Sequence, residues 1–209
     1  MNRPHEAASD TDVLAALRAA TSERHERLDS GLPLSGPTPD LDDYARHLTL
    51  VRDWLAPLQA WLDGFADGPQ AVLAPLERLP LIDADLAEPG MPVVRGASTP
   101  HAWPLDASAA YRWGVAYVIE GSQLGGAVLH RQLAERFAPH PLRYLRGVPQ
   151  GSGPRWREVM QALRAQVTTS EDIEQACAGA CAAFDAILAL ASLRDPVTTL
   201  SPPADRAVG

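Results

Sequence analysis

Apolar side chains recur every three or four positions in several segments, and proline-rich stretches separate these segments. This periodicity is typical of amphipathic helices. Helices are predicted at about 11–29, 40–65, 106–137, 155–168 and 170–193, with a shorter and weaker one at 69–87. No segment alternates apolar and polar residues with the enrichment in β-branched residues that marks strands. The sequence therefore predicts an all-α fold.

Polar residues at the predicted helix starts refine these boundaries. Asp10 or Thr11 is expected to cap the first helix and Asp40 the second, because short oxygen-bearing side chains accept from free N–H groups. Ser170 is expected to cap the last helix, with acidic residues in its first turn. Pro57 should kink or divide the second helix. The segments 88–105 and 139–154 are expected to be loops.

The chain has 209 residues, enough to bury a substantial core in one domain. No repeat or domain boundary is apparent. We therefore expect one multi-helical domain over 11–193, with a flexible N-terminus at 1–10 and a disordered tail at 194–209.

The formal charge of −8 argues against a general nucleic-acid or anionic-membrane binder. No apolar run approaches the roughly 20 residues of a membrane span, and the N-terminus lacks the apolar core of a secretory signal. A cytoplasmic protein is expected. Cys177 and Cys181 form no disulfide framework; they lie one helical turn apart and could bind a soft metal, but small buried residues are the better interpretation. The chain contains no lysine, so Arg, His or backbone N–H groups must hold any bound anion.

His25 lies beside the apolar stripe of the first helix, close to Leu14 and Arg18 on the helical wheel. Asp29 is one turn further on, where a carboxylate can accept from an imidazole nitrogen, as metal-bound histidines usually require. A stripe with one His and an offset Arg suits a large, flat, apolar ligand with an acidic edge. The alternative is a solvent-exposed His that is paired with Asp29.

Three glycines fall within GSQLGG at 121–126, inside a predicted helix. Each costs about 1 kcal/mol relative to Ala, so the glycines need a reason. Close helix packing and a plain helix break are two explanations, and close approach of a ligand to the backbone is the third. A phosphate-binding loop is disfavoured, because no strand precedes the segment and no GK[ST] follows.

Together, the two motifs resemble those of the heme oxygenases, and most closely the bacterial biliverdin-producing type associated with bacteriophytochromes. LRAATSERHERLD at 17–29 is similar to the proximal helix of that family, and YVIEGSQLGG at 117–126 is similar to its glycine-rich distal helix. The resemblance covers roughly 11–193. It implies a helical fold with heme between these two helices.

The resemblance also implies roles for individual residues. His25 would be the axial ligand to heme iron, with Asp29 as a candidate acceptor for its other nitrogen. Gly121, Gly125 and Gly126 would let the distal backbone lie close to the porphyrin and to O2. Ser122 stands where the animal enzymes have Asp, which leaves the proton-relay group open between it and its neighbours Glu120 and Gln123. Further contacts to heme would come from Arg18, Arg157, Arg155 and the aromatic ring of Phe184.

The implied activity is oxidation of heme by O2 and electrons to biliverdin, CO and ferrous iron. The chain carries no redox cofactor motif, so the electrons would come from an external donor such as a ferredoxin or a flavin reductase. The product would supply a bacteriophytochrome or release iron for nutrition. Two alternatives stay open: a heme carrier or sensor without turnover, and a protein of the same fold that binds another small molecule.

Overall fold

The helices α5 (Ala109–Leu133) and α8 (Ser170–Ser192) cross in backbone contact near the start of α5. A Cβ atom at Gly114 would overlap the carbonyl oxygen of Ala176, and one at Gly179 would overlap the carbonyl oxygen of Tyr111. Only glycine leaves room for so close an approach of two backbones. The structure, a computed structural model, describes residues 12–75, 77–98, 102–147 and 151–193.

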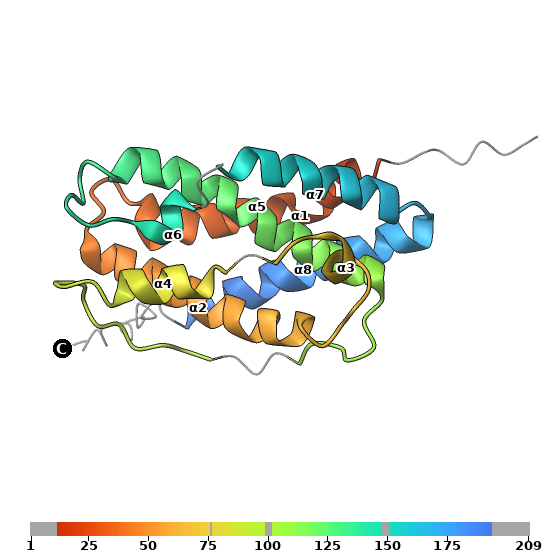
Figure 1. The fold of residues 1–209 in the computed structure, drawn as a ribbon, viewed down its shortest axis with the longest axis horizontal. Helices are drawn as coiled ribbons and strands as arrows, with labels where there is room; N and C mark the ends of the chain where they lie inside the picture. Colours follow the sequence, from red (N-terminus) through yellow and green to blue (C-terminus); the bar gives the residue numbers. More distant parts are fainter. Residues whose placement is uncertain (1–11, 76, 99–101, 148–150, 194–209) are drawn as a thin grey trace, which may run out of the picture.

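The helix α1 (Val13–Gly31) lies along α8. The thiol of Cys181 lies 3.4 Å from the carbonyl oxygen of Ala20, and one turn further on Arg24 pairs with Asp185 at 2.8 Å. Because the two contacts advance together, α1 and α8 run in the same direction. Figure 1 shows that α5 runs in this direction as well.

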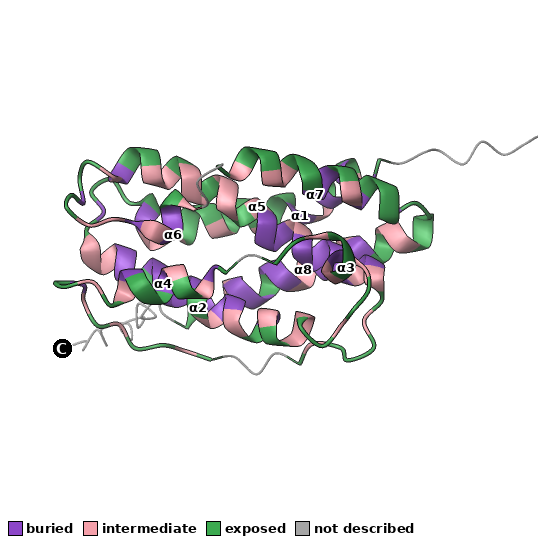
Figure 2. Ribbon diagram, viewed as in Figure 1, coloured by how far each residue is buried: buried purple, intermediate pink, exposed green. Residues whose placement is uncertain are grey.

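The other helices surround this group. α2 (Leu41–Leu62) packs against α8, where the Trp54 indole N–H donates to the carbonyl of Ala183 at 3.0 Å. The remaining helices are α3 (Pro69–Val72), α4 (Leu79–Leu86), α6 (Arg143–Arg146) and α7 (Ser152–Gln166), with a 3₁₀ turn at Pro33–Ser35. Buried residues follow the faces that the helices turn toward one another (Figure 2). The described residues include no strand, which confirms the all-α prediction.

Two of the predicted helix caps need correction. The carboxylate of Asp40 accepts from the Asp43 N–H at 2.9 Å, and Asp43 accepts in return, so the second helix begins as predicted. Ser170 does not cap the last helix; Thr169 does, accepting from the Asp172 N–H at 3.1 Å. Asp12 caps α1, whereas Asp10 and Thr11 lie outside the described residues, as do the expected flexible termini.

Three expectations about helix continuity also changed. Pro57 lies inside α2, which continues to Leu62 and is not divided. The predicted helix at 69–87 is wrong: Leu73 is extended and Pro75 follows, so the segment forms α3 and α4 separately. The predicted loop at 139–154 contains α6, a single turn too short to show periodicity.

α8 is long and apolar enough to cross a membrane by length and composition alone. Its alanines account for much of this hydropathy, and α1, α2 and α5 all pack against it. Hydropathy alone therefore does not distinguish a membrane-spanning helix from a core helix. In this structure α8 is a core helix that packs against α1, α2 and α5.

We predict that Gly114→Ala destabilises the protein by about 3 kcal/mol, because the new methyl group forces two packed backbones apart. Gly125→Ala, in the same helix, is the matched control. A Cβ there meets nothing within 4 Å, so the better helix former should raise stability by up to about 1 kcal/mol. Urea unfolding of the ligand-free protein measures both effects. Equal effects of the two substitutions would contradict the proposed backbone contact.

Burial of His47 on α2 predicts an acid-sensitive step in stability. Burial lowers the pKa of His47 to about 4, and its Nδ1 has no hydrogen-bond partner. Below about pH 6.5 the His47 imidazole therefore binds a proton in the unfolded chain but not in the folded chain. The free energy of unfolding thus decreases as the pH falls from 6.5 toward 4. His47→Leu should remove on the order of 3 kcal/mol of this pH dependence. The measurement is urea unfolding at pH 7 and pH 4.5, with His130→Gln as the control; an unchanged pH dependence in His47→Leu would contradict the assignment.

Candidate functional site

His25 lies on the exposed side of α1, beside Asp29 and Phe184. Its Nδ1 lies 3.0 Å from a carboxylate oxygen of Asp29, and 62% of the His25 side chain is exposed. The Phe184 ring of α8 lies beside it, with ring centroids 5.8 Å apart. A carboxylate that accepts from Nδ1–H leaves the lone pair of Nε2 free for a metal. The structure thus brings together three of the residues selected from the sequence.

The glycine segment lies in the middle of α5, and the helix continues through it. A Cβ at Gly121 would make an ordinary contact with the Trp156 ring at 3.5 Å, and one at Gly126 would lie 3.9 Å from Leu145. At Gly125 a Cβ would meet open space. The helix-break explanation is therefore wrong. Packing against Trp156 and Leu145 leaves room for a methyl group at Gly121 and Gly126, and packing does not explain Gly125. Contacts within the protein would therefore allow alanine at each of these positions, although glycine makes the helix less stable.

α1 and α5 approach each other beside α8. Burial raises the pKa of Tyr117 on α5, and the nearby charge of Arg18 on α1 partly offsets this. His25 lies about 10 Å beyond Arg18 along α1, and Gly121 and Gly125 lie about 6 and 12 Å beyond Tyr117 along α5. Because the two helices run in the same direction (Figure 1), His25 and Gly125 both lie beyond Arg18 and Tyr117, toward the C-terminal ends of their helices.

Sequence reasoning missed two aromatic residues at this place. Tyr117 and Trp156 lie with ring centroids 5.4 Å apart, and Trp156 covers Gly121. Tyr117 is one helical turn before Gly121 and so shares its face, a signal that was available in the sequence. Trp156 comes from α7 and has no such local signal.

The candidate arginines divide into two groups. Arg18 on α1 and Arg157 on α7 are exposed, and neither forms an ion pair with another described residue. Arg155 is engaged elsewhere: it pairs with Glu120 at 3.2 Å and donates to the carbonyl of Ala74 at 2.8 Å. Arg18 and Arg157 are therefore available to an anionic ligand, whereas Arg155 is not.

The polar residues that follow Tyr117 on α5 point to different sides. Ser122 is exposed, and its Oγ donates to the carbonyl of Ile119 at 2.7 Å. The Gln123 amide donates to the hydroxyl of Tyr144 at 3.0 Å. Glu120 is buried and faces away from Gly125, so of the three it does not belong to the site.

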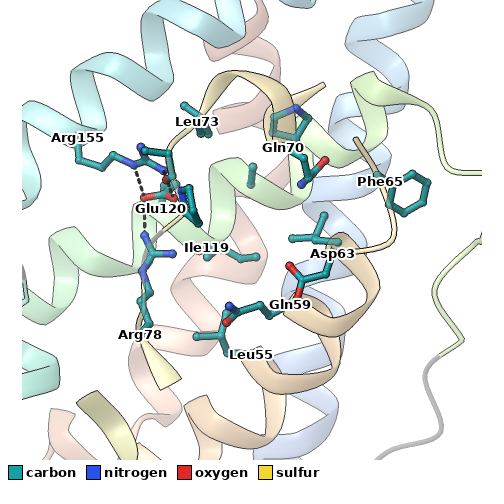
Figure 3. Close-up of a pocket in the computed structure, with 15 residues that line it drawn as sticks. Leu55, Gln59, Asp63, Phe65, Gln70, Leu73, Arg78, Ile119, Glu120 and Arg155 are labelled. Carbon is teal, nitrogen blue, oxygen red and sulfur yellow. Dashed lines mark hydrogen bonds and ion pairs between the residues drawn. The ribbon is translucent and has the colours of Figure 1, made fainter. Parts of the chain in front are cut away.

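A cavity of about 270 Å³ lies on this other side of α5, between α2, α3 and α5. Figure 3 shows Arg78 and Arg155 approaching the Glu120 carboxylate from two directions. The lining residues include neither His25 nor any residue of the glycine segment. The cavity is therefore separate from the site between α1 and α5.

No metal site of the ordinary kind is present in the described parts of the chain, since no three His, Cys, Asp or Glu side chains gather there. Cys177 and Cys181 are unpaired, and burial raises the pKa of both thiols. A metal held by His25 would thus need to arrive with other ligands of its own, as the iron of a porphyrin does.

Comparisons with known proteins place the chain in a family. No family model matches the chain. A curated heme oxygenase of Xanthomonas campestris pv. campestris (strain 8004) is 34% identical over 151 residues, which are 69% of this chain and 86% of the relative. The structure of the NO- and CO-bound heme oxygenase from Neisseria meningitidis matches with a TM-score of 0.61 and 22% identity, covering 88% of this chain and 92% of that one.

The structural match shows a shared fold, and the sequence match extends over most of the relative's length. The chain belongs to the heme oxygenase family.

Proposed function

We propose that the protein is a heme-degrading oxidoreductase that binds heme between α1 and α5. It cleaves the porphyrin to biliverdin, CO and ferrous iron, using O2 and electrons. One observation carries this proposal: Gly125 is a costly glycine inside a helix that faces open space, on the helix opposite the exposed His25–Asp29 pair. A flat ligand that lies against α5 explains why glycine occupies this position despite its cost in helix stability.

His25 is the proposed ligand to the heme iron. The Asp29 carboxylate, 3.0 Å from Nδ1, is the proposed acceptor for Nδ1–H, which would orient the ring and leave the Nε2 lone pair for the iron. The ring of Phe184 limits how the imidazole can turn. Residues of α1 and α8 thus hold the proximal side.

The glycine segment is the proposed distal surface. Bound heme supplies both the iron that activates O2 and the carbon skeleton that is oxidised. The backbone at Gly125 would leave room for O2 close to the ring, whereas a side chain there would fill that space. Ser122 is the exposed polar group next to this surface.

Heme carries two propionates, which need cationic partners. Arg18 and Arg157 are exposed and free of ion pairs within the described ranges, and Tyr117 lies close to Arg18. Charge-assisted hydrogen bonds from such groups are about twice as strong as neutral ones. We propose that Arg18 and Arg157 bind the propionates.

The proposed electron donor is an external protein, a ferredoxin or a flavin reductase, and the proposed location is the cytoplasm. The resemblance to the bacteriophytochrome-associated type makes a bacteriophytochrome the proposed acceptor of biliverdin. The proposed domain spans 11–193.

Titration with hemin, followed by reduction in air with catalase present, tests the proposed activity. We expect a stoichiometric Soret band that decays as a biliverdin spectrum grows. A stable heme complex that gives no biliverdin, even with a protein reductant, would instead indicate a carrier or sensor. No Soret band at all would contradict heme binding.

His25→Ala should weaken or remove axial ligation and leave α1 intact, because Ala is the better helix former. The measurement is the absorption and EPR spectrum of the hemin complex. His130→Ala, in the last turn of α5, controls for the loss of a histidine. A hemin spectrum identical to that of the unmodified protein in His25→Ala would rule out the axial assignment.

Gly125→Leu should disturb the distal side without abolishing heme binding. The side chain enters space that is open in the ligand-free protein, so folding is unaffected while biliverdin formation falls at least about tenfold, or 1.4 kcal/mol in barrier height. Val128→Leu, an exposed position further along α5, is the control. Full turnover by Gly125→Leu would show that close approach to the backbone is not required.

A further inference from the structure

The cavity beside Glu120 combines one charged end with apolar walls. Its volume is about 270 Å³, which is just below the roughly 300–1,000 Å³ of pockets for drug-sized ligands, so only a small molecule fits. Figure 3 shows Arg78, Glu120 and Arg155 together at one end. The apolar part of the lining comes from α2, α5 and the segment after α3: Leu55, Leu62, Leu73, Ala116 and Ile119. These surroundings suit a ligand with one polar group and an apolar body.

Two guanidinium groups share one enclosed carboxylate at the charged end. Arg78 Nη2 lies 2.5 Å from one oxygen of Glu120, and Arg155 Nη2 lies 3.2 Å from the other. The side chains of Arg78, Glu120 and Arg155 are only 10%, 7% and 13% exposed. Glu158 also approaches Arg155, at 3.4 Å, but it is 53% exposed, so water screens its charge. The enclosed end of the cavity therefore has more positive than negative charge.

Arg78 has unused hydrogen-bonding capacity. A guanidinium carries five N–H donors, and among the described residues only Nη2 of Arg78 has a partner, the carboxylate of Glu120. The Nε of Arg78 is fully enclosed and has no partner. Arg155, by contrast, uses all three of its nitrogens, on two carboxylates and one main-chain carbonyl. Because a buried cation is costly unless it is paired, Arg78 is the group at this end that lacks an anion.

The far side of the cavity does not supply this anion. Asp63, at the end of α2, is the other acidic residue among the described lining residues, and Figure 3 shows it across the cavity from Arg78 and Arg155. Asp63 is exposed, as are Ala74 and Pro75 of the lining, so the cavity is open to solvent there. A ligand can therefore enter from solvent and bring an anionic group to Arg78.

We propose that this cavity binds a small monocarboxylate with an apolar chain, of the medium-chain fatty acid type. Its carboxylate pairs with the part of the Arg78 guanidinium that Glu120 leaves free, and its chain lies along the apolar walls of α2 and α5. Carboxylates form charge-assisted hydrogen bonds with guanidinium groups, and burial of the chain removes apolar surface from water. An inorganic anion would leave the apolar walls in water, and a neutral hydrocarbon would leave Arg78 without an anion. The proposal goes beyond the proposed function and does not rest on it.

Calorimetric titration of the full chain, without hemin, tests the proposal with octanoate as the probe. We expect octanoate to bind with one-to-one stoichiometry. 1-Octanol has the same chain without the charge, so it should bind at least about tenfold more weakly, because hydrogen bonds to charged groups are the stronger ones. Equal affinity for octanol and octanoate, or no octanoate binding below its micelle concentration, would overturn the proposal.

Two substitutions locate the octanoate. Arg78→Gln removes the incompletely paired guanidinium and leaves Glu120 with Arg155, so octanoate affinity should fall at least about tenfold. Ala116→Leu fills the apolar part of the cavity, keeps both arginines and should weaken binding as strongly. Arg52→Gln, which removes an exposed arginine of α2, is the matched control. Thermal unfolding identifies folded variants; unchanged octanoate affinity in either folded cavity variant would overturn the proposal.

A last arm separates this cavity from the proposed heme site, where Arg18 and Arg157 would also attract a carboxylate. The titration is repeated on protein saturated with hemin and on the Arg18→Gln variant. Octanoate affinity should be unchanged in both, because neither change touches the lining of the cavity. Loss of octanoate binding in either would place octanoate at the heme site and overturn the proposal. Failure to form biliverdin would contradict the proposed function alone, since octanoate binding is measured without turnover.

Discussion

The backbone contact between α5 and α8 determines where everything else in the molecule lies. Gly114 and Gly179 allow the two helices to touch, and α1 then packs along α8 in the same direction. α1 and α5 consequently both pack against α8 and lie beside each other. The exposed face of each, with His25 on one and Gly125 on the other, is left without a protein partner.

Glycines serve two opposite purposes within α5. At Gly114 a side chain would collide with another helix of the same chain, so the protein's own packing requires glycine. At Gly125 nothing in the protein would collide, and the helix would be more stable with alanine. In the proposed function, the second kind of glycine makes room for heme, and its cost in stability is then tied to the reaction.

Local spacing predicted the features that depend on one helix alone. Asp40 opens α2, and Asp29 reaches His25 one turn away, because both contacts lie within a few residues in the sequence. The motif at 121–126 was recognisable because glycine is rare inside a helix. Thr169 was missed in favour of its neighbour Ser170, since both residue types cap well and the boundary differs by one position.

The remaining features depend on contacts that sequence spacing does not reveal. Arg155 resembled a propionate ligand, but it pairs with Glu120 from another helix. Tyr144 gave no signal for its bond to Gln123, because α6 is a single turn and α5 lies elsewhere in the sequence. Both assignments require knowing which helix faces are adjacent, which only the packing of α4, α5, α6 and α7 establishes.

A crystal structure of the protein with hemin bound tests most directly whether heme lies between α1 and α5. We expect iron within bonding distance of His25 Nε2, the macrocycle against the backbone at Gly125, and an unchanged contact between α5 and α8 at Gly114. Iron on another residue, or hemin in the separate cavity beside Glu120, would contradict this placement.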